Sequence, residues 1–166
     1  MTFKRETFAT FPDDVIVMRL TAYAPGKISF TARMTYPPEM EGHGASVATE
    51  GNDVLIMKGK APANAGWDAR EGMTYQSRVH IANAGGTIVA HDGTLTVANA
   101  NSVVLIYGDA TSYNGFDKEP GTQGVAPEPI VKAAVTRAAA KSYAQLLAAH
   151  LADYQTLFRR VWVDIN

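Results

Sequence analysis

The chain contains no cysteine among its 166 residues, so disulfide bonds, thiolate metal ligands and cysteine nucleophiles are all excluded. A marked excess of either positive or negative charge is also lacking. Fifteen basic residues stand against 16 acidic ones, and no run of lysine and arginine could neutralise several phosphates in a row, so nucleic acid is not expected as a partner. No apolar run approaches the roughly 18 residues that a membrane-spanning helix needs, and residues 1–10 lack the apolar stretch of a signal peptide. No membrane partner is expected, and the sequence does not choose a compartment.

The sequence also lacks the motifs by which catalytic sites are most easily recognised. The GxSxG elbow, the P-loop and the GxGxxG phosphate cradle are all missing. No two histidines have the i, i+4 spacing of a metal-binding helix, so we expect no metal and no cofactor. The histidines are His43, His80, His91 and His150, of which the last is expected to be a packing residue on a helix. The carboxylates that fall in turn-like segments, where such groups commonly cap and solubilise, are Asp13, Asp14, Glu39, Glu41, Asp68 and Glu71.

Between Val15 and Thr111 the chain has the pattern of short β-strands. Glycine, proline, asparagine and aspartate separate segments rich in valine, isoleucine, threonine and aromatic residues. The predicted strands are Val15–Ala22, Lys27–Met34, Val54–Lys60, Met73–Ile81, Gly86–Ala90, Thr94–Ala98 and Ser102–Thr111, with an eighth at Phe3–Ala9. This spacing predicts an antiparallel β-sandwich. Because the eighth strand begins almost at the first residue, we expect only part of a larger sandwich.

Two local patterns refine this prediction. Tyr23-Ala24-Pro25-Gly26 has the composition of a hairpin turn and is expected to join the strands on either side of it. In the strand that follows, Ile28, Phe30 and Ala32 alternate with polar residues and are expected to share one face.

The character of the sequence changes after Thr111, where a polar loop at 112–129 leads into alanine-rich sequence. A helix is predicted from near Pro129, since proline is tolerated at an early helical position. Its apolar face comprises Ile130, Val131, Ala134, Val135 and Ala138. A second helix is predicted after Ser142, because residues 142–145 have the composition of a capping box. Its wide apolar stripe comprises Tyr143, Leu146, Leu147, His150, Leu151, Tyr154, Leu157 and Phe158.

The predicted fold is therefore mainly β with C-terminal helices: an antiparallel, partial β-sandwich followed by two linker helices. The expected division is a sandwich over residues 1–111, a connecting loop over 112–129 and a helical linker over 130–166. Val161–Ile165 is expected to end the linker as a short strand.

One segment of the polar loop is too particular to be a generic connection. Residues 111–120 (TSYNGFDKEP) place two aromatic rings and two polar side chains directly after an apolar strand. Tyr113 and Phe116 are candidates to stack on a sugar ring, and Asn114 and Asp117 are candidates to bind its hydroxyls. The alternative is structural: the two rings fasten the loop to the following helix.

Six segments together resemble the N-terminal β-sandwich region of family 95 glycoside hydrolases, the α-L-fucosidase group. They cover nearly the whole chain, and the segments at 111–120 and 150–161 are the most specific. The segments are 5–9 (RETFA), 12–20 (PDDVIVMRL), 25–30 (PGKISF), 92–95 (DGTL), 111–120 (TSYNGFDKEP) and 150–161 (HLADYQTLFRRV).

The resemblance implies a larger enzyme with an N-terminal supersandwich, a helical linker, an (α/α)₆ barrel and a small β domain. Its inverting hydrolysis uses a glutamic acid and a water activated by asparagine and aspartate residues, all in the barrel. No catalytic residue of the family corresponds to a position in this chain. The chain is expected to lack the first strands of the sandwich and to stop just after the linker.

Three hypotheses follow. The first is a non-catalytic sandwich and linker fragment of such a hydrolase, whose partners are the missing barrel, carbohydrate through the parent enzyme, and a second copy through its exposed helix stripe. The second is an independent carbohydrate-binding module that uses the Tyr113–Asp117 loop and Trp67. The third, a complete small hydrolase, requires a carboxylate pair about 5–10 Å apart across a cleft, and the sequence does not reveal such a distance.

Overall fold

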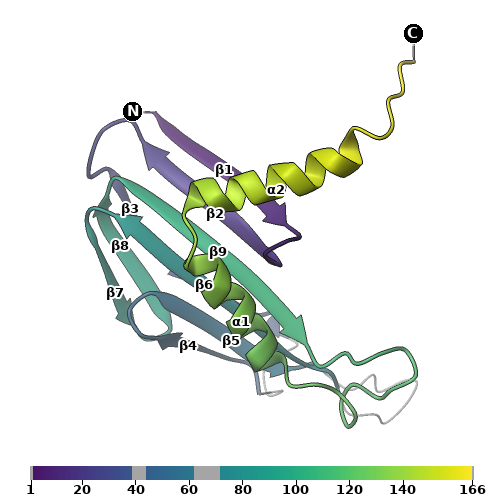
Figure 1. The fold of residues 1–166 in the computed structure, drawn as a ribbon. Helices are drawn as coiled ribbons and strands as arrows, with labels where there is room; N and C mark the ends of the chain where they lie inside the picture. Colours follow the sequence, from purple (N-terminus) through teal and green to yellow (C-terminus); the bar gives the residue numbers. More distant parts are fainter. Residues whose placement is uncertain (1, 39–43, 62–71, 166) are drawn as a thin grey trace.

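The computed structural model describes residues 2–38, 44–61 and 72–165, which form two antiparallel sheets and two helices. The larger sheet has the strand order β1-β2-β9-β6-β5-β4, and the smaller has the order β3-β8-β7. The bounds are β1 (Phe3–Thr10), β2 (Val15–Ala22), β3 (Ile28–Arg33), β4 (Ser46–Glu50), β5 (Val54–Lys60), β6 (Thr74–Ala84), β7 (Thr87–His91), β8 (Thr94–Ala100), β9 (Ser102–Thr111), α1 (Pro127–Ala139) and α2 (Tyr143–Phe158). The predicted β-sandwich with C-terminal helices is confirmed, and Figure 1 shows how the helices follow it.

The two sheets enclose the first of two hydrophobic cores. Alternate residues of the larger sheet, such as Leu55, Ile81 and Val103, pack against Leu95 and Val97 of β8. The predicted alternation in β3 is confirmed, since Ile28 is buried and Phe30 and Ala32 are half-buried while their neighbours are exposed. β-Branched residues dominate this core because they fit a pleated, half-buried surface.

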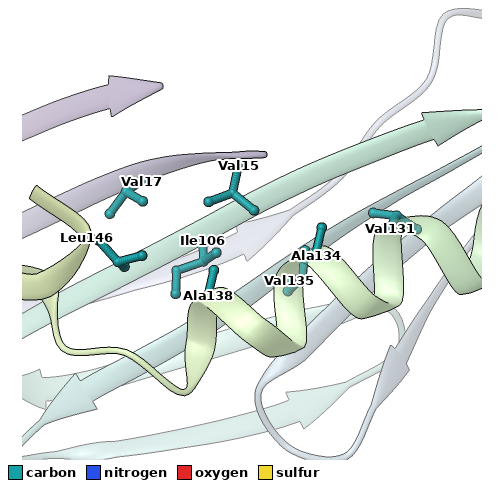
Figure 2. Close-up of a cluster of buried hydrophobic side chains, with 8 residues drawn as sticks. All are labelled: Val15, Val17, Ile106, Val131, Ala134, Val135, Ala138 and Leu146. Atoms are coloured by element: carbon teal, nitrogen blue, oxygen red, sulfur yellow. The ribbon is translucent and has the colours of Figure 1, made fainter. Parts of the chain in front are cut away.

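The second core lies on the opposite face of the larger sheet, beneath α1. Figure 2 shows the α1 side chains pointing toward the sheet, where they meet Val15, Val17 and Ile106. The apolar face predicted for this helix is confirmed except at its first residue: Val131, Ala134, Val135 and Ala138 are buried, whereas Ile130 is 46% exposed. Burying one valine side chain contributes on the order of 1.5–3 kcal/mol, so this face fixes α1 on the sheet.

Two expectations about local structure are wrong, and one strand was missed. Residues 23–26 do not form a hairpin, because β2 is already paired on both sides with β1 and β9, and the chain crosses to the other sheet instead. Gly26 supports the crossing with a φ of 66° and an N–H that donates to Oδ1 of Asn101 at 2.7 Å. The edge strand β4 was not anticipated, since its sequence SVATE lacks the alternation of polar and apolar residues that marks a strand. Residues 161–165 adopt neither helix nor strand.

A buried carboxylate joins the β1–β2 turn to the end of α1. Asp13 was expected to be a solvated turn residue, but it is fully buried, and Lys141 Nζ donates to its Oδ1 at 2.5 Å. Arg137 Nη2 adds a bond to the Asp13 carbonyl oxygen at 3.3 Å, and Thr10 Oγ1 lies 3.5 Å from the carboxylate. The turn is therefore tied to the helix junction by charge as well as by packing.

A second ionic cluster fastens α1 to the opposite edge of the larger sheet, at β4. The carboxylate of Glu50 on β4 accepts from the buried guanidinium of Arg78 on β6 and from Nζ of Lys132 on α1. The hydrogen bond from Arg78 holds the pKa of Glu50 below its ordinary value, and the charges of Arg78 and Lys132 act in the same direction. The stabilising contribution is therefore present at neutral pH and is lost when the pH falls through the lowered pKa.

Helix α2 begins on the sheet and then leaves it. The capping box predicted at Ser142 is confirmed, with Ser142 Oγ accepting from the N–H of Gln145 and the Gln145 side chain accepting from the N–H of Ser142. Leu146 is buried, and His150 stacks on Phe8 of β1 with ring centroids 4.9 Å apart, as expected of a packing residue. The helix contacts β1, and Figure 1 shows its second half continuing past the sheet.

Replacement of Asp13 tests the importance of the buried ion pair. We expect Asp13→Ala to lower the free energy of unfolding by about 2–3 kcal/mol, because it removes the acceptor for Lys141 and leaves a void in a closed site. Asp109→Ala, at an exposed position of β9, is the control and should cost less than about 1 kcal/mol. Urea denaturation measures both, and equal losses for the two variants would contradict the role given to Asp13.

Candidate functional site

The loop that carries the sugar-binding candidates is anchored at its base by Ser112. This residue is buried at the end of β9, where it exchanges backbone and side-chain hydrogen bonds with Thr74 at 2.9 and 3.0 Å. Its hydroxyl donates to the carbonyl oxygen of Pro120 at 2.7 Å, and its own carbonyl accepts from the N–H of Val125 at 3.1 Å. One buried serine thus closes the loop onto the sheet.

The second half of the loop depends on a close backbone approach at Gly124. A Cβ at this position would lie 2.2 Å from the carbonyl oxygen of Pro120 and 2.5 Å from that of Ser112, so only glycine fits without a shift. Gln123 completes the closure: its side-chain oxygen accepts from the N–H of Glu119 at 3.1 Å, and its carbonyl accepts from Nδ2 of Asn114 at 3.0 Å. The loop is a defined structure held by its own hydrogen bonds.

The structure brings together only two of the four candidate residues. Phe116 and Asp117 line one open cavity of about 430 Å³, together with Lys118, Glu119 and Gln123. The side-chain amide of Asn114 donates to the carbonyl oxygen of Gln123 within the loop. Tyr113 lies outside this lining and is 58% exposed.

The cavity combines an aromatic surface with charged groups. Phe116 is 97% exposed, so its ring does not fasten the loop to the helix, which was the structural alternative. Gly115 has a φ of 110° and turns the chain between Asn114 and Phe116. A ring face beside a carboxylate and an ammonium group can stack on a sugar and bind its hydroxyls. Binding of a sugar by this loop stays a prediction.

The histidines and acidic residues do not assemble elsewhere in the part of the chain described. His80 Nε2 lies 3.4 Å from Asp53, and His91 Nδ1 lies 3.1 Å from Asp92 at an exposed turn. Over residues 2–38, 44–61 and 72–165 no three His, Asp or Glu side chains are grouped closely enough to hold a metal ion. Outside the described residues lie His43, Glu39, Glu41, Trp67, Asp68 and Glu71. Neither helix has the length and apolar character needed to cross a bilayer.

Comparison with known proteins gives a family and two relatives. Residues 1–115 match the family model described as "Glycosyl hydrolase family 65, N-terminal domain". The chain is 27% identical to "Alpha-L-fucosidase 2" of Arabidopsis thaliana over 99% of its length and 21% of that protein. It is 29% identical to "Probable alpha-fucosidase A" of Aspergillus niger over 95% of its length and 20% of that protein. The chain therefore spans about a fifth of the length of these relatives, and the resemblance to α-L-fucosidase-like glycoside hydrolases is confirmed.

A single methyl group at Gly124 tests the closure of the loop. We expect Gly124→Ala to destabilise the chain by about 1–3 kcal/mol, because the new Cβ must push two carbonyl oxygens apart. Hydrogen exchange should accelerate across residues 112–125 and stay unchanged in β9. The exposed Thr122→Ala serves as the control, and protection of the loop in both variants would show that the close approach is unimportant.

Proposed function

The chain belongs to the family of glycosyl hydrolase N-terminal domains whose model it matches, and we propose that it is the non-catalytic sandwich and linker portion of an α-L-fucosidase-like glycoside hydrolase. In this proposal the hydrolysis is inverting and takes place in an (α/α)₆ barrel formed by residues outside these 166. The names and lengths of the two relatives support it, since both are named as α-fucosidases, one of them as probable, and both are about five times as long. The chain's role is to hold the barrel in place.

The observation that carries this proposal is the exposed apolar surface at the C-terminal end of the chain. Tyr154 stacks on His150 and Phe158 stacks on Tyr154, with centroids 5.7 and 5.1 Å apart, so a ladder of rings leads away from the sheet. Phe158 is 66% exposed and Trp162 is 87% exposed. The other exposed apolar residues of this surface are Leu151, Leu157, Val161, Val163 and Ile165. We call these residues, with Tyr154, Phe158 and Trp162, the C-terminal apolar surface.

An exposed apolar surface of this kind typically marks an interaction site. Its position suits the linker role, because the first half of α2 is held on β1 while the second half extends past the sheet. The ion pair between Asp13 and Lys141 and the cap at Ser142 set the direction in which α2 leaves. A barrel that packs on the C-terminal apolar surface would therefore be placed at a fixed orientation to the sandwich.

Without that barrel, the same surface should drive self-association of the isolated chain. We expect sedimentation velocity to show dimers or larger species at micromolar concentrations, because burying the exposed rings against a second copy removes apolar area from water. Leu157→Glu with Phe158→Glu should restore the monomer. The matched control is Ala148→Glu with Ala152→Glu, which places the same charges on exposed positions of the same helix. A wild-type chain that stays monomeric would contradict the proposal.

A second candidate function is an independent carbohydrate-binding module that uses the loop from Tyr113 to Asp117. The exposure of Phe116 beside Asp117 favours it, because an aromatic ring at a loop tip is a common platform for sugars.

Titration with fucosylated oligosaccharides distinguishes this module from a purely architectural role. For the module we expect millimolar binding that Phe116→Ala weakens by about tenfold through loss of the stacking surface. Asn114→Ala should weaken binding through loss of loop order, since the Asn114 amide holds Gln123. If calorimetry detects no heat of binding and the oligosaccharides cause no spectral shift, the module hypothesis is wrong. The architectural proposal is unaffected by that result.

A further inference from the structure

A second cavity, of about 390 Å³, lies where the β1–β2 turn meets β9. Its lining includes Phe11 and Asp14 from the turn, Ile16 from β2, and Tyr107 and Asp109 from β9. These five residues define what we call the turn groove. Its residues differ from those of the 113–117 loop and from those of the C-terminal apolar surface.

The register of the larger sheet places two residues of the turn groove on the face opposite the helices. Val15, Val17 and Ile106 pack under α1, so the alternate residues Ile16 and Tyr107, which are paired across β2 and β9, face the other way. Ile16 is 43% exposed, which shows that the three-stranded sheet does not cover this part of the face. The groove is therefore open to a ligand.

The aromatic residues of the groove offer a surface that is partly preorganised. Phe11 is 85% exposed at the tip of the turn, where its ring packs against little of the protein. Tyr107 is held in place because its hydroxyl donates to Oγ of the buried Ser77 at 3.4 Å. Aromatic faces of this kind stack on the apolar C–H face of a pyranose ring.

Two carboxylates supply the polar part of the groove. Asp14 and Asp109 are exposed, and neither forms an ion pair with another residue in the described part of the chain. Asp14 has a φ of 57° and holds its carboxylate in a left-handed turn position, which is uncommon for a residue other than glycine. Carboxylate oxygens accept hydrogen bonds only, so they suit the hydroxyl donors of a sugar and repel an anionic ligand.

We propose that the turn groove binds a neutral hexopyranose ring, stacked on Phe11 and Tyr107 with its hydroxyls donating to Asp14 and Asp109. This inference does not depend on the proposed function, because it needs neither the barrel nor the 113–117 loop. It adds a second sugar-contacting position to the sandwich. The two carboxylates make the site selective for neutral rings over uronic acids.

The test is an NMR titration of the full 166-residue chain with four probes: D-galactose, D-galacturonate, sorbitol and Ca²⁺. Galactose and galacturonate share a ring and differ in charge, whereas sorbitol has hydroxyls but no ring to stack. We expect galactose to shift the Phe11 and Tyr107 signals with a Kd of about 1–10 mM. Galacturonate should bind at least about fivefold more weakly because of the two carboxylates, and sorbitol and Ca²⁺ should leave these signals unchanged.

Two variants and a control assign the binding to the groove. Phe11→Ala should weaken galactose binding by about threefold to tenfold through loss of the ring surface. Asp109→Asn keeps the shape of the side chain but removes its charge. It should therefore reduce the difference in affinity between galactose and galacturonate. Tyr23→Ala removes a similarly exposed aromatic ring at the other end of β2 and should change nothing. Folding of each variant is checked from the dispersion of its amide signals.

Three outcomes of the wild-type titration would overturn the proposal. They are no shift of the groove signals at about 50 mM galactose, equal binding of galactose and sorbitol, and a response to Ca²⁺ in place of sugar. Unchanged galactose affinity in a folded Phe11→Ala variant would likewise place any binding elsewhere. Because the groove shares no residue with the loop or the C-terminal apolar surface, these outcomes leave the proposed function untouched.

Discussion

The larger sheet is apolar on both faces, and each face has to be covered before the chain can be stable. The three-stranded sheet covers one face and buries Leu95 and Val97 against it, while α1 covers the other through Val131, Ala134, Val135 and Ala138. Transfer of these side chains from water is the dominant favourable term, and α1 is therefore part of the folded sandwich. Helix α1 is thus a structural element of the domain, which gives α2 a fixed starting point.

Charge and capping then determine where the chain goes. Asp13 loses its solvation when it is buried and is compensated by Lys141, which lies between α1 and α2. Ser142 starts the next helix one residue later, with both hydrogen bonds of its capping box formed. The ring ladder from Phe8 through His150 and Tyr154 to Phe158 continues this geometry off the edge of the sheet. The same contacts that stabilise the domain thus aim the C-terminal apolar surface outward.

Much of the fold could be predicted from local patterns. The alternation in β3, the apolar face of α1 and the cap at Ser142 are encoded within a few residues, and the structure confirms them. Pairing was harder, since the chain around Gly26 looks like a hairpin and changes sheets only because both sides of β2 are already occupied. The burial of Asp13 depends on Lys141, which is 128 positions away. Similarly, the turn groove joins residues almost 100 positions apart in the sequence, such as Phe11 and Asp109, and no spacing rule would connect them.

Hydrogen exchange along α2 tests most directly whether the chain presents a surface meant for another domain. At concentrations where the isolated chain is monomeric, the account predicts that the first half of α2 is protected with the sheet. Residues 151–158 should then exchange about 100-fold faster, because that half of the helix lies beyond the sheet and depends on a partner for stability. Uniform protection of the whole of α2 in the monomer would contradict the account, since the helix would then need nothing further to hold it.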